Sequence, residues 1–297
     1  MIDPKIFYST FLVNYFDFKT TYLKFALKNY KQFHLENILL QYSDKDFLVT
    51  IKSDIRQTLF QAIETVFEIL FALTPDKDGF TADKDILRTL SKGEFHYKKI
   101  NQISEDPQAL DFLNNDVLLT DGAKVSVGQY IFYFGLHKAD DIQEKIQISL
   151  EAVKNGLFIL AKEFADRNEY NCYKHGLRII PALNFFKVMR ADNNDQIANW
   201  DLSDSMTYYR EDENENKMQF ITKVFDTERD LNLLRLCSDL IWNIIKIRDI
   251  AFNKLPKISS ETASVDVLFF DKDLIKVANK GNIPIQNLRF TTTFEKT

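Results

Sequence analysis

Glycine and proline are scarce in this chain, with 8 glycines and 6 prolines among 297 residues. These residues are the strongest local breaks in regular structure, so their scarcity predicts long uninterrupted elements and favours helices over many short strands. Apolar residues make up 45% of the sequence, which is enough for a sizeable core. The length suits one large domain or two ordinary ones.

Charge and cysteine content restrict the classes of partner and compartment. The net charge is −5 at pH 7, so an anionic partner would have to bind a local patch of positive charge. Two cysteines, Cys172 and Cys237, are too few for a disulfide framework, and we expect a reducing, cytoplasmic compartment. The first residues do not resemble a signal peptide. Charges interrupt the most apolar stretches, so we expect no membrane association through a spanning helix.

Apolar residues spaced three and four apart predict the helices. The expected helices are residues 21–42, 53–73, 85–103, 140–165 and 227–252. Ser53 is expected to cap the second helix and Pro75 to end it, while Gly93 interrupts the third. Asp226 or Thr227 is expected to cap the last helix. Because both carry continuous apolar stripes, we expect 140–165 and 227–252 to pack on each other.

Two hairpins are expected among these helices. Asp121 and Gly122 lie between β-prone runs, and residues 205–225 read as two strands around "DENENK". The segment "ALNFFKV" also has the composition of a strand. The predicted fold class is therefore mainly α, a helical bundle with a β-hairpin insertion between two C-terminal helices.

This reading divides the chain into three parts. An N-terminal helical region covers 1–135, and the bundle covers 136–256 with its insertion at about 182–225. The remaining 257–297 are a C-terminal tail, which is rich in Ser and Thr and is expected to be weakly ordered.

The segment "RNEYNCYKHGLR", residues 167–178, is the candidate site. On a helix, Arg167, Asn171 and His175 share one face, and Lys174 and Arg178 lie within one turn of it. Nearby cations lower the pKa of a histidine, and a neutral imidazole is what a general base requires. Arginine suits a phosphate group because it can donate two parallel hydrogen bonds. The face could therefore bind a phosphodiester and remove the proton from a hydroxyl beside it.

The opposite face of the same helix carries Tyr170, Tyr173 and Leu177 at apolar spacing. A different interpretation of the segment fits the same pattern. In it, the polar face is solvated or partly buried, and Asn171 and His175 donate or accept hydrogen bonds within the protein.

The pair Arg167–Asn168, followed by a helical His175, resembles the HEPN superfamily (higher eukaryote and prokaryote nucleotide-binding), although the spacing to His175 is one residue longer than in that motif. Members of this superfamily resemble one another as small helical bundles. Many are metal-independent ribonucleases, often toxins or antiviral effectors that work as dimers.

The resemblance implies roles for the site residues. His175 would accept the proton of a ribose 2′-hydroxyl, and Arg167 and Arg178 would stabilise the charge that grows on the phosphate. Asn171 would orient the histidine or bind the phosphate, and Lys174 and Arg178 would be phosphate-binding residues. No cofactor and no metal are implied.

Two further motifs carry weaker signals. Arg248 and Asp249 on the last helix resemble a second copy of the HEPN motif, but Asn253 occupies the histidine position and an amide cannot act as a base. The loop "TPDKDGFTADKD" has the glycine of a calcium-binding loop, but Thr74 and Asp85 replace two of its ligands. We expect neither catalysis nor calcium binding from these motifs.

Two functions from different classes follow. The first is an RNA-directed, HEPN-like protein, which as an enzyme would be a metal-independent endoribonuclease acting in defence or as a toxin, with RNA as its partner and a homodimer as its assembly. The alternative is a non-enzymatic protein-interaction module, in which the aromatic-rich N-terminal helices bind a protein partner. In that case the polar face around His175 is structural.

Overall fold

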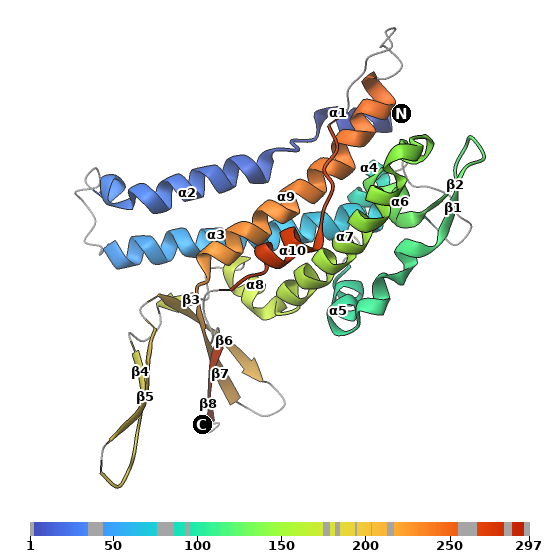
Figure 1. The fold of residues 1–297 in the computed structure, drawn as a ribbon. Helices are drawn as coiled ribbons and strands as arrows, with labels where there is room; N and C mark the ends of the chain where they lie inside the picture. The colour runs from blue at the N-terminus through green and yellow to red at the C-terminus, as the bar shows by residue number, and fades with distance from the viewer. Residues whose placement is uncertain are drawn as a thin grey trace. The chain divides into compact units, whose positions relative to one another are not determined.

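The chain is mainly helical, as predicted, in a computed structural model (Figure 1). The structure describes residues 3–34, 44–75, 86–92, 96–174, 179–181, 185–193, 195–202, 204–212, 217–254, 266–281 and 287–293. None of the helices within these ranges is both long and apolar enough to cross a membrane.

The chain forms two compact units, and each is assembled from three separate stretches. The first unit contains Met1–Lys19, Leu59–Ala165 and Asn232–Lys280. The second unit contains Thr20–Thr58, Asp166–Leu231 and Gly281–Thr297. The long helices α2 (Tyr15–His34), α3 (Asp44–Leu73) and α9 (Thr227–Asp249) each contribute residues to both units.

The described residues of the first unit are helical apart from one short hairpin. Its remaining elements are α1 (Pro4–Thr10), α4 (Ile86–Ser91), α5 (Tyr97–Glu105), η2 (Pro107–Asn114), β1 (Asp116–Leu118), β2 (Lys124–Ser126), α6 (Val127–Phe132), η3 (Leu136–Lys138), η4 (Asp140–Ile142), α7 (Gln143–Phe164), η5 (Ile250–Lys254) and α10 (Lys272–Ala278). The predicted hairpin is confirmed, since β1 and β2 pair antiparallel around Gly122. Gly122 has φ +84°, a conformation that favours glycine.

Helix α7 packs closely on α9 and α10 in the first unit, which confirms the predicted contact between the two long C-terminal helices. At Gly156 of α7, an added Cβ atom would lie 3.5 Å from Leu236 of α9 and 3.1 Å from Ile275 of α10. The apolar stripe expected on 140–165 is buried from Ile146 to Phe164. Because glycine has no side chain, these helices can lie close together at position 156.

A polar network fixes the segment before α10 against the helices of the first unit. The Tyr133 hydroxyl contacts Ser149 and donates to the carbonyl of Leu268 at 3.1 Å. The Asn243 side chain accepts from the Leu268 N–H at 3.0 Å and donates to the Leu268 carbonyl at 3.1 Å. The Phe270 N–H donates to Ser149 Oγ at 2.6 Å. Within the tail, which was expected to be weakly ordered, residues 266–281 are thus held by side chains of α7 and α9 and contain a helix.

The second unit combines helices with most of the strands. Its further elements are α8 (Arg167–Lys174), β3 (Ile179–Pro181), β4 (Phe185–Met189), β5 (Gln196–Asp201), β6 (Ser205–Asp212), β7 (Lys217–Val224) and β8 (Asn287–Thr293). Four strands form an antiparallel sheet in the order β3-β6-β7-β8, and β4 pairs with β5 alone among the described strands. The hairpin predicted at 205–225 is confirmed by β6 and β7, whose register places Asp212 opposite Lys217.

The insertion between α8 and α9 is larger than a single hairpin. It contains β3 and the β4–β5 ribbon as well as β6 and β7, and β8 from the tail adds a further strand beside β7. The sequence of β8, "NLRFTTT", alternates apolar and polar residues at its start and is rich in the β-branched residue Thr, which is typical of a strand.

Two helices begin before the predicted residues. Helix α2 begins at Tyr15 and not at residue 21. Ser53 is not an N-cap, because α3 begins at Asp44 and the Ser53 hydroxyl donates to the Val49 carbonyl at 2.5 Å inside the helix. The helix expected at 85–103 is interrupted, as predicted: α4 ends at Ser91 and α5 begins at Tyr97, and Gly93 lies outside the described residues. Two predicted ends are confirmed: α3 stops at Leu73 before Pro75, and Asp226 caps α9 by accepting from the Arg229 N–H at 3.3 Å.

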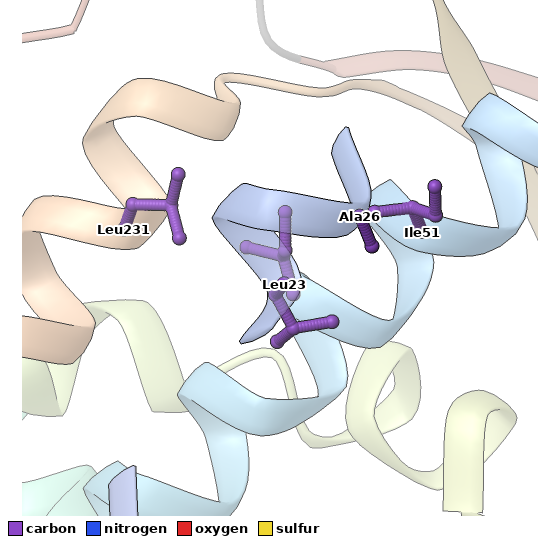
Figure 2. Close-up of a cluster of buried hydrophobic side chains, with 5 residues drawn as sticks. Leu23, Ala26, Ile51 and Leu231 are labelled. Carbon is purple, nitrogen blue, oxygen red and sulfur yellow. The ribbon is translucent and has the colours of Figure 1, made fainter. Parts of the chain in front are cut away.

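A small apolar cluster joins α2, α3 and α9 in the second unit. Leu23 and Ala26 of α2 lie with Ile51, Ile55 and Leu231, and Figure 2 shows the first two side chains beside Ile51. Leu27 and Tyr30, expected on the apolar stripe of residues 21–42, are partly buried against this cluster. One face of α2 is therefore packed on the protein.

Candidate functional site

The predicted site residues lie on and immediately after α8, in the second unit. Arg167 is the first residue of α8, Asn171 lies in its middle and Lys174 is its last residue. His175 and Arg178 lie outside the residues that the structure describes. Of the five predicted site residues, the structure thus brings three together on one short helix.

Helix α8 has two distinct faces. Tyr170, Cys172 and Tyr173 are buried, which confirms the prediction that both tyrosines face the protein. On the other side, Asn168 and Lys174 are exposed and Asn171 is half-buried. These three residues, spaced three apart, form what we call the outer face of α8.

The buried side of α8 is attached to the sheet and to its own N-terminus. Cys172 and Tyr208 of β6 belong to one buried apolar cluster with Ile221 of β7. The Tyr208 hydroxyl donates to the carboxylate of Asp166, which also accepts from the Glu169 N–H at 3.3 Å. Asp166 therefore caps the helix and ties it to the sheet.

Glu169 is the only carboxylate within α8, and it points into the protein, where it is 1% exposed. Arg56 of α3 binds it with two hydrogen bonds, from Nε at 2.7 Å and from Nη2 at 3.1 Å. Lys223 of β7 donates to the same carboxylate at 2.7 Å. Arg56 also donates from Nη1 to Asp230 of α9 at 2.9 Å. We refer to Arg56, Glu169, Lys223 and Asp230 as the buried charge cluster.

The buried charge cluster is electrically balanced, with two cations and two carboxylates. Burial by itself raises the pKa of Glu169, but the charges of Arg56 and Lys223 outweigh this effect and hold the pKa below its usual value. The ionised carboxylate therefore stabilises the folded state above the ordinary pKa of a glutamate. This contribution is lost as the pH falls through the lowered pKa.

Tyr173 lies beside the same cluster. Burial, together with the negative charge of Glu169, raises the pKa of Tyr173 well above its usual value. Its hydroxyl donates to Met206 Sδ at 3.3 Å. A neutral tyrosine with this contact is a packing residue and not an acid–base group at neutral pH.

The cavity at the buried charge cluster is too small for a substrate. It measures about 10 Å³ and is lined by the cluster with Asp226 and Arg229. A volume of this size holds about one water molecule. The cluster therefore serves to position α8, β7 and the start of α9 within the second unit.

This cluster was not predicted from the sequence, although its members carry a signal. Arg56 lies three residues before Leu59 and seven before Ile63, on the apolar stripe of α3. Glu169 precedes Cys172 and Tyr173 by three and four residues, on the buried face of α8. A charge on an apolar stripe requires a buried partner of opposite charge, and this rule could have identified both residues.

The residues compared with a second HEPN motif, Arg248, Asp249 and Asn253 in the first unit, have structural contacts. The Arg248 side chain is fully buried and donates from Nη1 to the Ile131 carbonyl at 2.6 Å and from Nη2 to the Tyr130 carbonyl at 2.8 Å. Its guanidinium lies 5.2 Å from the centre of the Tyr130 ring. Asn253 donates to Asp249 at 3.3 Å and to the Lys5 carbonyl at 3.1 Å. These groups hold helices together.

Metal binding finds no support in the described ranges. Within them, no three His, Cys, Asp or Glu side chains gather closely enough to hold an ion together. The loop compared with a calcium site lies outside the described residues from position 76 onward.

Comparison with known proteins adds no further assignment to this geometry. No protein-family model, no curated protein and no solved structure matches the chain.

Proposed function

We propose that this chain is an RNA-directed, HEPN-like protein that binds the phosphate backbone through the outer face of α8 and the residues that follow it. The observation that carries the proposal is the orientation of Glu169. Because this carboxylate is buried against Arg56 and Lys223, it does not oppose an anion at the outer face. Within α8, that face carries Asn168, Asn171 and Lys174.

The sequence that follows α8 adds the remaining chemistry. Lys174 is exposed, and its Nζ lies 5.3 Å from the centre of the Tyr170 ring, so the cation is held near the end of the helix. His175 is the next residue in the sequence, and Arg178 follows three residues after it. As a ribonuclease, the protein would use His175 as the general base and Arg167 and Arg178 to stabilise the phosphate charge.

The experiment is a cleavage and binding assay on total RNA, with and without a chelator. His175→Ala should abolish cleavage while RNA binding stays nearly unchanged, because the base is lost and the cations remain. Cleavage should persist in the presence of the chelator. Arg178→Ala and Lys174→Ala should each weaken binding and flatten its salt dependence by about one released counterion.

Lys276→Ala is the matched control, since this exposed lysine on α10 belongs to the other unit. It should leave both cleavage and binding unchanged. The proposal is wrong if the unmodified protein neither binds nor cleaves RNA. It is also wrong if the Lys276 variant loses as much binding as the Lys174 and Arg178 variants do.

A further inference from the structure

Helix α2 carries a row of large aromatic side chains that face solvent. Tyr15, Phe18, Tyr22 and Phe25 are 47%, 72%, 61% and 56% exposed. An exposed row of this kind marks an interaction site more often than an ordinary surface. We call these four residues the aromatic stripe. It lies on a single helix, and the helix itself sets the relative positions of its members.

The aromatic stripe is not part of the core, because other residues of α2 provide the packed face. Leu23 and Ala26 contact the cluster with Ile51 and Ile55 (Figure 2), and Phe16 and Thr20 are also buried. The only residue of α2 with non-helical backbone angles, Asn29, comes after the stripe. The four rings are therefore presented on a regular helix that is anchored from behind.

The spacing of the aromatic stripe indicates the shape of its partner. Its members follow one another at intervals of three, four and three residues. This is the spacing of the a and d positions along a coiled-coil seam, which accepts the side chains of a second helix as knobs into holes. An amphipathic helix binds such a face through its own residues at i, i+3 or i+4, and i+7.

The charges beside the stripe indicate the chemistry of that helix. Lys24 and Lys28 are exposed around Phe25, at the C-terminal end of the stripe, and Lys31 is exposed beyond Asn29. The only acidic residue in the sequence of α2 is Asp17. A second copy of α2 in parallel register would bring these lysines toward each other, which disfavours that pairing, whereas carboxylates on a partner helix would complement them.

We propose that the aromatic stripe of α2 docks an amphipathic helix of a protein partner, one whose apolar seam is flanked by Glu or Asp. The inference is independent of RNA binding at α8, since it uses a different helix and different residues. Its failure and the failure of the proposed function can be observed separately.

The test uses the full-length chain and two synthetic helical peptides of three heptads. Both peptides have Leu at the a and d positions, and the flanking positions are Glu in one and Lys in the other. Fluorescence anisotropy should show that the Glu-flanked peptide binds at least tenfold more tightly than the Lys-flanked peptide. Binding of the Glu-flanked peptide should weaken as salt is added.

Substitutions then locate the binding surface. Phe18→Ser with Phe25→Ser should weaken binding of the Glu-flanked peptide at least tenfold. Lys24→Glu, Lys28→Glu and Lys31→Glu together should reverse the preference between the peptides. Val277→Ser, at a residue of α10 that is 62% exposed, is the matched control and should change nothing. Thermal melts should confirm that all variants stay folded, since the altered side chains are exposed.

Several outcomes would overturn the proposal. One is the absence of measurable binding by the Glu-flanked peptide, and another is equal binding of the two peptides. Loss of binding in the Val277 variant would place the site elsewhere. Dimerisation in sedimentation velocity that is lost with Phe18→Ser and Phe25→Ser would assign the stripe to a second copy. Aromatic-dependent binding of oligouridine or of phosphatidylserine vesicles, without binding of the peptide, would assign it to RNA or to a membrane.

Discussion

Arg56 holds two carboxylates at once, and they come from parts of the sequence far from α3. Its guanidinium binds Glu169 of α8 through two nitrogens and Asp230 of α9 through the third. A planar guanidinium suits this arrangement because its donors are fixed in direction, whereas a lysine offers one ammonium group. Arg56 therefore connects α3 to both α8 and α9 within the second unit.

Replacing Arg56 should destabilise the protein strongly. Arg56→Met removes the cation and leaves Glu169 and Asp230 buried with insufficient positive charge, which typically costs about 3–5 kcal/mol. Urea unfolding followed by circular dichroism would measure the change. Lys174→Met removes an exposed cation from the same region and should cost no more than about 0.5 kcal/mol. Equal effects of the two variants would mean that the cluster contributes little.

The buried carboxyl of Asp239, on α9 in the first unit, should make the stability of the protein depend on pH. Burial raises the pKa of Asp239 to about 6; Arg235 opposes this shift and the negative charge of Asp17 adds to it. Because the unfolded carboxyl ionises at its usual lower pKa, ionisation of Asp239 destabilises the folded state. The penalty begins above that usual pKa, grows as the pH rises toward 6 and is complete above it.

Asp239→Asn should therefore stabilise the protein by on the order of 1–2 kcal/mol above pH 7 and by almost nothing at pH 4. Denaturant unfolding at both pH values would measure the difference. Arg235→Gln is a control with the opposite effect. It removes the cation that favours the ionised form of Asp239, so it should destabilise the protein above pH 7. A gain in the Asp239 variant that is equal at both pH values would contradict this account.

At the residue scale, the sequence predicted which side of α8 is buried but not how it is held. The spacing of Tyr170 and Tyr173 is local, and local spacing can be read directly. The partner of Glu169 lies 113 residues away, and no local pattern links the two. The predicted roles of His175 and Arg178 stay predictions.

At the scale of elements, the distance between α7 and the helices beside it depends on Gly156. A Cβ atom there would lie 3.1 Å from Ile275 and 3.5 Å from Leu236, so the neighbours have little room to move. Gly156→Val should cost roughly 1–3 kcal/mol, because overpacking forces side chains out of their preferred rotamers. Denaturant unfolding would measure this cost.

An alanine at the same position separates two opposing effects. Alanine favours a helix interior over glycine by about 1 kcal/mol, while its methyl group contacts the end of the Ile275 side chain. The double variant Gly156→Ala, Ile275→Val should therefore have a higher free energy of unfolding than the effects of the two single variants, added together, predict. Strict additivity would show that the contact at Gly156 is not tight.

The helices could be predicted well where the apolar stripe is continuous, as in α7, α9 and the second half of α3. The first turns of α3 could not, because Phe47, Leu48 and Val49 form an adjacent apolar run with no helical spacing. Strand β8 was missed because its partner β7 is distant in sequence. Pairing over such distances depends on tertiary contacts that a local reading does not contain.

At the scale of the whole molecule, the C-terminal residues contribute to both units. Residues up to Lys280 complete the first unit, and β8 completes the four-stranded sheet of the second. Ending the chain after Gly281 would remove β8 and leave the β7 edge without this strand. Each ladder hydrogen bond that is lost should cost about 0.5–1.5 kcal/mol.

The shortened chain should unfold at a lower urea concentration and should self-associate in sedimentation velocity, because an exposed strand edge pairs with other chains. Ending the chain after Thr293 is the matched control. It leaves β8 complete and should behave like the full-length protein. A shortened chain that stays monomeric and equally stable would show that β8 contributes little to the sheet.

The order in which the stretches occur along the chain also has a consequence for biosynthesis. A protein emerges from the ribosome N-terminus first, at about 5–20 residues per second, and domains usually fold as they are completed. Here the first unit needs Asn232–Lys280 and the second needs Gly281–Thr297. Neither unit can be completed before its last stretch has been made. The apolar stripes of α3 and α7 therefore stay partly uncovered until residues 232–280 have been synthesised, which makes the nascent chain a natural client for chaperones.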